Sequence, residues 1–284
     1  MIELPELSLY ISHTCDIACE SCFTYNNLNW GKHFKYDGKS FDYIKDKVMF
    51  DVVCIIGGEP ATNPYLGEWM NTVDNCLISN HKFIVTNGRN LDKINQQYPN
   101  WQNNNWKLEI SAHSLNDLEI VFDWFYKNFK NVIIEKFYDD RHEDGMDHYN
   151  VYVNKKCIAE ITEAWFFYKD SLVIKENKEI TWNQLYDEYE THKKCIAKEC
   201  MYFLDGRFYR CSRQALLPYL TKTFKIDKKY KNLTELDLGC TAEDFVEWSK
   251  TRLEPQIQCR FCAWNEKIKL PKISNTKKLI AKKN

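Results

Sequence analysis

The stretch LSLYISHTCDIACESC, residues 7–22, joins a short β-rich run to three cysteines. LSLYIS (7–12) has the composition of a strand, and Cys15, Cys19 and Cys22 follow it with three and then two residues between them. The cysteines therefore fall on the loop that leaves the strand. A loop with this spacing can surround a single metal centre, so the first 22 residues predict both a strand and a thiolate site at its carboxyl end.

Further β-rich runs recur along the first half of the chain: VVCII (52–56), KFIVT (82–86), KLEIS (107–111) and NVIIEKF (131–137). Helical stretches lie between them, one following Asn63 and Pro64 and another at 115–129. This alternation predicts parallel βαβ units and an α/β fold. The strand ends read SHTC, GGEP, TNGR and SAHS, and we expect them to share one rim of the sheet, where α/β proteins carry their functional loops.

Composition excludes several classes of protein. The 284 residues are 44% hydrophobic, enough for a large core, and the formal net charge of −1 provides no overall field for nucleic acid or an acidic membrane. The N-terminus MIELPELSLY lacks the pattern of a signal peptide, and no run reaches the roughly 18 apolar residues of a membrane span. We expect a soluble, cytoplasmic protein with no membrane partner, and a nucleic-acid partner would have to be held by a local patch of charge.

Twelve cysteines are too many for an ordinary cytosolic chain, and disulfides are not expected there, so the cysteines indicate metal. Eight of them form two groups: Cys15, Cys19 and Cys22, then Cys195, Cys200, Cys211, Cys259 and Cys262. The remaining four are interpreted as small buried side chains: Cys54, Cys76, Cys157 and Cys240.

The first group favours an iron–sulfur cluster over zinc. Three thiolates leave one iron of a cubane cluster without a protein ligand, which makes that iron available to a small molecule. A structural zinc site would need a fourth ligand, for which His13 is the nearby candidate.

The second group contains a predicted hairpin. Asp205-Gly206 between MYFL and RFYR is a two-residue turn signal that sets Leu204 opposite Arg207. Counting outward sets Cys200 opposite Cys211, with Cβ atoms about 4.5–5.5 Å apart. The pair Cys259 and Cys262 could complete this centre. Five cysteines compete for four places, so Cys195 could replace Cys200, and a zinc ribbon is the alternative to a cluster.

The cysteine triplet, followed one βα unit later by Gly57-Gly58-Glu59-Pro60, resembles the radical S-adenosylmethionine superfamily. The resemblance implies a [4Fe-4S] cluster on Cys15, Cys19 and Cys22 that binds S-adenosyl-L-methionine, cleaves it reductively to a 5′-deoxyadenosyl radical and so abstracts hydrogen from a substrate. It implies a GGEP loop in which the carbonyls and the Glu59 carboxylate accept hydrogen bonds from the cofactor's amino group. The implied cofactor contacts are Gly57, Gly58, Glu59, Pro60, Asn87, Ser111 and Phe23.

The C-terminal half resembles the SPASM and shortened twitch extensions of the same superfamily, through the spacing from Gly206 to Cys211. This implies one auxiliary [4Fe-4S] cluster on ligands drawn from the second cysteine group. The expected architecture is a partial (β/α)6 TIM-like barrel over residues 1–180, a small cluster-binding domain of hairpin and helix over 181–270, and a basic tail over 271–284. A helix is expected within 181–194.

The resemblance leaves the substrate open. Modification of a peptide or protein is the first expectation, and dehydrogenation of a small alcohol or sugar is the alternative. An electron donor such as flavodoxin or ferredoxin is the implied partner. Two hypotheses of other classes remain, a zinc-binding module that contacts nucleic acid or protein, and a structural scaffold with inert cysteines.

Overall fold

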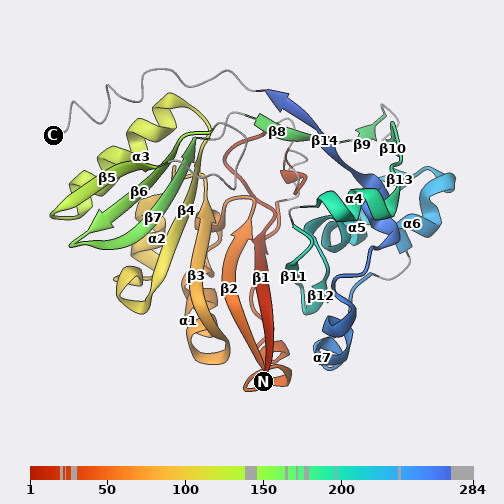
Figure 1. Cartoon of the computed structure of the whole chain (residues 1–284), viewed down its shortest axis with the longest axis horizontal. Helices are drawn as coiled ribbons and strands as arrows, with labels where there is room; N and C mark the ends of the chain where they lie inside the picture. Colours follow the sequence, from red (N-terminus) through yellow and green to blue (C-terminus); the bar gives the residue numbers. More distant parts are fainter. Residues whose placement is uncertain are drawn as a thin grey trace.

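The structure is a computed structural model and describes residues 1–19, 22, 24–26, 31–137, 146–163, 166–170, 172–175, 179–195, 197–235 and 238–269. It is a mixed α/β fold around a nine-stranded sheet of order β12-β11-β1-β2-β3-β4-β7-β6-β5 (Figure 1). The strands from β11 to β7 in this order are all parallel to their neighbours, whereas β12, β6 and β5 are antiparallel additions at the edges.

The strands of this sheet are β1 (Ile2–Ser12), β2 (Val48–Gly57), β3 (Ile78–Thr86), β4 (Trp106–Ala112), β5 (Val132–Phe137), β6 (His148–Val153), β7 (Lys156–Glu163), β11 (Cys200–Leu204) and β12 (Arg207–Tyr209). Five of them contain the five predicted strand runs of the first half of the chain. The first four predicted strands are parallel, as expected for βαβ units.

The expectation of a parallel arrangement is wrong for β5. It pairs antiparallel with β6, and a tight turn then returns the chain as β7 to the position beside β4. This turn has Asn154 (φ 49°) and Lys155 (φ 68°) at its centre, a backbone that matches the twist of a hairpin. Asn-Lys lacks the glycine that usually marks such a turn, which is why the hairpin was not apparent from composition.

Three helices cover one face of the sheet: α1 (Leu66–Cys76), α2 (Leu91–Gln97) and α3 (Leu115–Asn128) (Figure 1). Alternate residues of the strands, such as Leu7 and Leu9 of β1, face these helices and are fully buried. The predicted helix boundaries hold approximately, because Asn63 accepts a hydrogen bond from Tyr65 N (2.8 Å) just before α1, and Ser114 caps α3. The side chains between these residues along each strand therefore point to the opposite face of the sheet.

The remaining elements follow β7 in the chain. They are β8 (Phe166–Asp170), β9 (Leu172–Ile174), β10 (Glu179–Trp182), α4 (Glu188–Lys194), α5 (Ser212–Thr223), β13 (Lys225–Ile226), α6 (Lys231–Glu235), α7 (Phe245–Trp248) and β14 (Cys262–Lys269). The helix expected within 181–194 begins only at Glu188, because residues up to Trp182 belong to β10. A second apolar core forms where α5 packs near β1 and β11, and includes Tyr10, Tyr25 and Leu216.

The hairpin β11–β12 adds to the same sheet as the N-terminal strands, since β11 is parallel to β1. Leu204 is opposite Arg207, which confirms the predicted hairpin register. Within the described part of the chain, no helix is both long enough and apolar enough to span a membrane.

Candidate functional site

Two of the predicted loops meet at the carboxyl end of β1 and β2. The backbone N–H of Gly58 donates to Ser12 O (2.7 Å), and that of Glu59 donates to Thr14 O (2.8 Å). Parallel pairing of β1 with β2 ends at Ser12 and Gly57, so these bonds continue the ladder into the loops. The loop of the cysteine triplet and the GGEP loop are thus joined through their backbones.

The glycines are needed for this close approach. A Cβ atom on Gly58 would lie 2.4 Å from Thr14 O and 2.9 Å from Asn26 Cγ, and one on Gly57 would lie 2.6 Å from Ser12 O. No side chain fits at these separations. The sequence predicted that the glycines admit a ligand, whereas in the structure the groups that approach them belong to the neighbouring loop.

Glu59 lies inside the GGEP loop and is fully buried. Its Oε1 accepts hydrogen bonds from Ala61 N (3.0 Å) and Thr86 Oγ1 (2.8 Å), and its Oε2 accepts one from Asn87 N (2.8 Å). Burial raises the pKa of Glu59 to about 7, although these three donors act in the opposite direction. The Glu59 carboxylate therefore links the GGEP loop to the end of β3 through these hydrogen bonds. Pro60 begins the short 3-10 helix Pro60–Thr62, where its missing N–H costs nothing.

The TNGRN turn at the end of β3 reaches the cysteine loop. Asn87 Nδ2 donates to Asp16 Oδ1 (2.6 Å), and Asn90 Nδ2 donates to Asp16 Oδ2 (2.8 Å). Asp16 directly follows Cys15. The predicted loops at the ends of β1, β2 and β3 are therefore connected by hydrogen bonds into one rim.

The thiols on this rim are half-buried and interact electrostatically. Burial raises the pKa of Cys15 to about 12 and that of Cys19 to about 11, and the charge of Cys22 adds to both shifts. The Arg89 guanidinium acts in the opposite direction on the pKa of Cys19. Metal binding requires the thiolate form, so a metal bound here would displace the thiol protons.

Arg89 is held in place by a buried carboxylate. Its Nε lies 2.7 Å from Asp117 Oδ1 and its Nη2 3.2 Å from Oδ2, a two-pronged pair. Ser114 Oγ also donates to Asp117 Oδ2 (2.7 Å). Burial acts upward on the pKa of Asp117, but the hydrogen bonds from Arg89 and Ser114 hold it below its usual value. A fixed positive charge thus faces the cysteine loop from the end of β3.

His13 is not placed to complete a zinc site. It is 1% exposed, its ring packs against those of Phe34 and Tyr219, and its Nδ1 lies 3.1 Å from the Tyr10 hydroxyl. Burial, followed by the charge of Lys32, lowers the pKa of His13 to about 3. His13 belongs to a buried aromatic group with Phe34 and Tyr219.

In the C-terminal group, four thiols act on one another: Cys195, Cys211, Cys259 and Cys262. Burial raises the pKa of Cys195 to about 11, with Cys262 contributing, and that of Cys211 to about 12, with Cys259 and Cys195 contributing. Burial also raises the pKa of Cys259 to about 11, and Cys262 and Cys195 add to it. These cysteines come from the end of α4, the start of α5 and the segment that enters β14.

The Cys200 thiol is hydrogen-bonded to a carboxylate on β1. Its Sγ donates to Glu6 Oε2 (3.2 Å) on the neighbouring strand β1. Burial and then the Glu6 charge raise the pKa of Cys200. The register of Tyr202 with Tyr209 continues by count to Cys200 with Cys211. The paired strand β12 ends at Tyr209, so the contact between these two cysteines stays a prediction.

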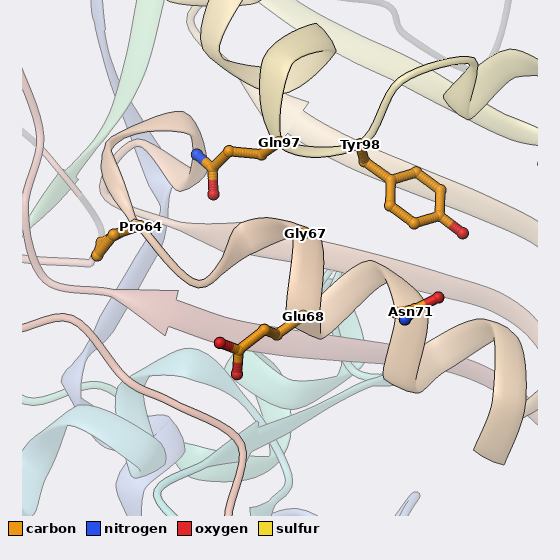
Figure 2. A pocket seen from close by; sticks show the side chains of 6 residues that line it. All are labelled: Pro64, Gly67, Glu68, Asn71, Gln97 and Tyr98. Atoms are coloured by element: carbon orange, nitrogen blue, oxygen red, sulfur yellow. The ribbon is translucent and has the colours of Figure 1, made fainter.

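Among the residues that the structure describes, no three His, Cys, Asp or Glu side chains lie close enough to hold a metal ion as they stand. Cavities lie beside two groups of described residues. One, of about 360 Å³, lies between α1 and the end of α2 and is lined by Pro64, Gly67, Glu68, Asn71, Gln97 and Tyr98 (Figure 2). None of these is a predicted site residue. The other, of about 520 Å³, includes Glu6, Cys195 and Cys200 in its lining.

The remaining predicted residues are less informative. Ser111 is half-buried on β4, in register with Thr162 of β7. Its contact with the cofactor stays a prediction. Phe23 lies outside the described residues. Of the four isolated cysteines, Cys54 and Cys240 are buried as expected, whereas Cys76 and Cys157 are half-buried.

Sequence reasoning missed Asp16, Asn90 and the Arg89 and Asp117 pair. The signal for the first two was present, since an acid between two cysteines and two asparagines three residues apart both lie on predicted loops. The pair could not be found because its members are joined only by the packing of α3 beside the end of β3.

Comparison with known proteins adds little. No family model and no curated protein matches this chain. Among solved structures, the chain is similar to the crystal structure of selenomethionine BtrN in an open conformation, with 9% sequence identity and a TM-score of 0.44. The similarity covers 92% of this chain and 91% of that one. What this chain does must therefore be argued from its own residues.

Proposed function

We propose that this protein is a radical S-adenosylmethionine enzyme, in which Cys15, Cys19 and Cys22 hold a [4Fe-4S] cluster. The observation that carries the proposal is the direct bonding of three loops far apart in the sequence, through Glu59 to Thr14, Glu59 to Asn87 and Asn87 to Asp16. When bound, the cluster would supply an electron for cleavage of S-adenosylmethionine to a 5′-deoxyadenosyl radical, which abstracts hydrogen from the substrate.

The donor set fits an iron–sulfur cluster better than zinc. The loop offers three thiols, and the imidazole nearest to them in the sequence, that of His13, is buried against aromatic rings. A three-thiol set leaves one iron open to the cofactor. In this proposal the parallel strands form a partial barrel, and the domain boundaries are those predicted above, at residues 180 and 270.

The roles of the cofactor residues follow from their contacts. Glu59 and Asn87 are occupied in joining loops, so we assign them to support of the rim. Half-buried Gly57, Gly58 and Ser111 are left as candidates for direct contact with the cofactor. We assign the auxiliary cluster to Cys195, Cys211, Cys259 and Cys262, because the Cys200 thiol is hydrogen-bonded to Glu6, although Cys195 acts on the pKa of Cys200 as well as on those of Cys211 and Cys259.

The substrate would bind on the sheet face that α1, α2 and α3 leave uncovered. That face carries polar side chains along β4 and β7, including Lys107, Glu109 and Thr162. A peptide or protein is the proposed substrate, with a small alcohol or sugar as the alternative, and flavodoxin or ferredoxin is the proposed electron donor.

The test is anaerobic purification and reconstitution, followed by counting of iron and sulfide and a search for 5′-deoxyadenosine after reduction. Changing Cys15, Cys19 or Cys22 singly to Ala is expected to abolish 5′-deoxyadenosine, while the auxiliary iron remains. Cys76→Ala is the matched control, because Cys76 is a half-buried thiol on α1 outside both groups. Zinc in place of iron, or unchanged cleavage in a triplet variant, would refute the proposal.

A further inference from the structure

We infer that Asp16 is a positioning residue, whose carboxylate is clamped by Asn87 and Asn90 so that the segment bearing Cys15 and Cys19 is held against the turn after β3. The inference deepens the proposed function, and rests on it, because it concerns the loop assigned to the catalytic cluster. Asp16 itself is exposed, so its conformation depends on these bonds and not on packing.

The orientation of the Asn87 side-chain amide is determined by a hydrogen bond from the backbone of the same turn. Asn87 Oδ1 accepts a hydrogen bond from Arg89 N (2.9 Å), which leaves Nδ2 to face Asp16 Oδ1 at 2.6 Å. An amide turned the other way would set oxygen against carboxylate oxygen and lose the bond to Arg89 N. Asn87 therefore acts as a directed donor.

Asn90 donates the second hydrogen bond to Asp16 and leaves the start of α2 without a side-chain cap. It occupies the N-cap position of α2, where an asparagine side chain usually accepts a hydrogen bond from the first turn. Here the side chain makes no cap bond, and Nδ2 donates to Asp16 Oδ2 at 2.8 Å. The position of an ordinary capping residue is thus used to hold the cysteine loop.

The turn that carries Asn87 and Asn90 is held by contacts with other elements. Asn87 N donates to buried Glu59, and Gly88 has φ +79°, with space for a Cβ blocked by Val121 (2.5 Å) and Ile110 (2.9 Å). The turn is thereby fixed to the GGEP loop, to α3 and to β4. The segment that bears Asp16 therefore takes its position from this turn.

The clamp also sets a negative charge beside the candidate cluster. Asp16 Oδ1 lies 4.0 Å from Cys15 Sγ. A carboxylate at this distance opposes the addition of an electron to a cluster on Cys15, since charge near a cluster is one of the factors that set its potential. Asp16 is therefore expected to keep the midpoint potential low as well as to order the loop.

The first readout needs no metal. In the metal-free protein, 15N relaxation should show that Asp16→Ala lowers the backbone order parameters of residues 15–19 to below about 0.6, because alanine removes both acceptors of the clamp. Asp51→Ala is the matched control, since Asp51 accepts a similar bond from Asn80 (3.0 Å) at the opposite end of the strands. The control should leave residues 15–19 unchanged.

Asp16→Asn keeps both bonds when the Asn90 amide turns its Oδ1 toward the new side chain, and should leave the order parameters of residues 15–19 near the wild-type values. Unchanged order parameters in Asp16→Ala, or an equal change in Asp51→Ala, would overturn the clamp. These measurements use no iron, so a chain that fails to bind a cluster would refute the proposed function and leave the clamp standing.

The second readout is the midpoint potential of the reconstituted cluster, followed by electron paramagnetic resonance during a redox titration. Asp16→Asn should shift it to a more positive value, whereas Asp51→Asn should not. A purely mechanical role would leave the potential unmoved, so an unchanged potential in Asp16→Asn, in which residues 15–19 stay ordered, would overturn the electrostatic part of the inference.

Discussion

Cys200 and Glu6 are register partners on the parallel strands β11 and β1, and the Cys200 thiol donates a hydrogen bond to the Glu6 carboxylate with 3.2 Å between Sγ and Oε2. The bond directs the thiol along the sheet and toward the cavity of about 520 Å³ that Glu6 and Cys195 also line. Cys195 raises the pKa of Cys200 as well as those of Cys211 and Cys259. The register therefore gives the Cys200 thiol a carboxylate partner on β1.

Cys195→Ser is expected to lose the C-terminal iron, whereas Cys200→Ser is expected to retain it, because serine can keep the hydrogen bond to Glu6. The measurement is iron per chain after reconstitution, in a background where the N-terminal cysteines are intact. Loss of iron in Cys200→Ser alone would instead support the pairing of Cys200 with Cys211 that hairpin counting predicts.

Glu59→Gln is expected to lower the free energy of unfolding by about 1–3 kcal/mol, because the amide turns a donor toward Asn87 N and leaves a buried N–H without its acceptor. Urea unfolding of the metal-free protein measures this loss. Glu68→Gln is the control, since Glu68 forms only an exposed ion pair with Lys35, and its change should stay within about 0.5 kcal/mol. Equal effects of the two substitutions would show that Glu59 does not support the rim.

Stability should depend on pH through Glu59. Its pKa is about 7 in the folded state, raised by burial from an ordinary value of 4.5, so the folded chain binds more protons than the unfolded chain between these values. The contribution of Glu59 is full below about pH 4.5 and is lost as pH rises through about 7. The advantage of the wild type over Glu59→Gln should fall across this range, and an advantage that rises with pH would contradict the shift.

Gly58→Ala should destabilise the rim by about 1–3 kcal/mol, because its Cβ would overlap Thr14 O at 2.4 Å and the backbone must move. Binding of S-adenosylmethionine to the reconstituted protein should weaken as well. Gly31→Asn is the control, since no atom lies within 4 Å of a Cβ there and asparagine tolerates its φ of +61°. Full stability and binding in Gly58→Ala would show that the two loops need not touch.

Local sequence determined the elements of the first half of the chain and the identity of its loops. Apolar runs and helix caps predicted β1 to β5, α1 and α3, because burial of alternate strand residues and capping of helix ends depend on neighbours in the chain. The turn Asp205-Gly206 likewise predicted the Leu204 and Arg207 register. The cysteine and GGEP spacings identified the rim residues before any contact between them was known.

Only the tertiary structure decided which of these residues meet. The position of β7 beside β4, the side of β11 toward which Cys200 turns, and the clamp of Asp16 by Asn87 and Asn90 all depend on pairing between segments distant in the sequence. The turn at Asn154 and Lys155 contains no glycine, so the sequence did not predict it. Hydrogen bonds across loops form because packed strands bring their ends together, and that proximity is a property of the assembled sheet that spacing along the chain does not contain.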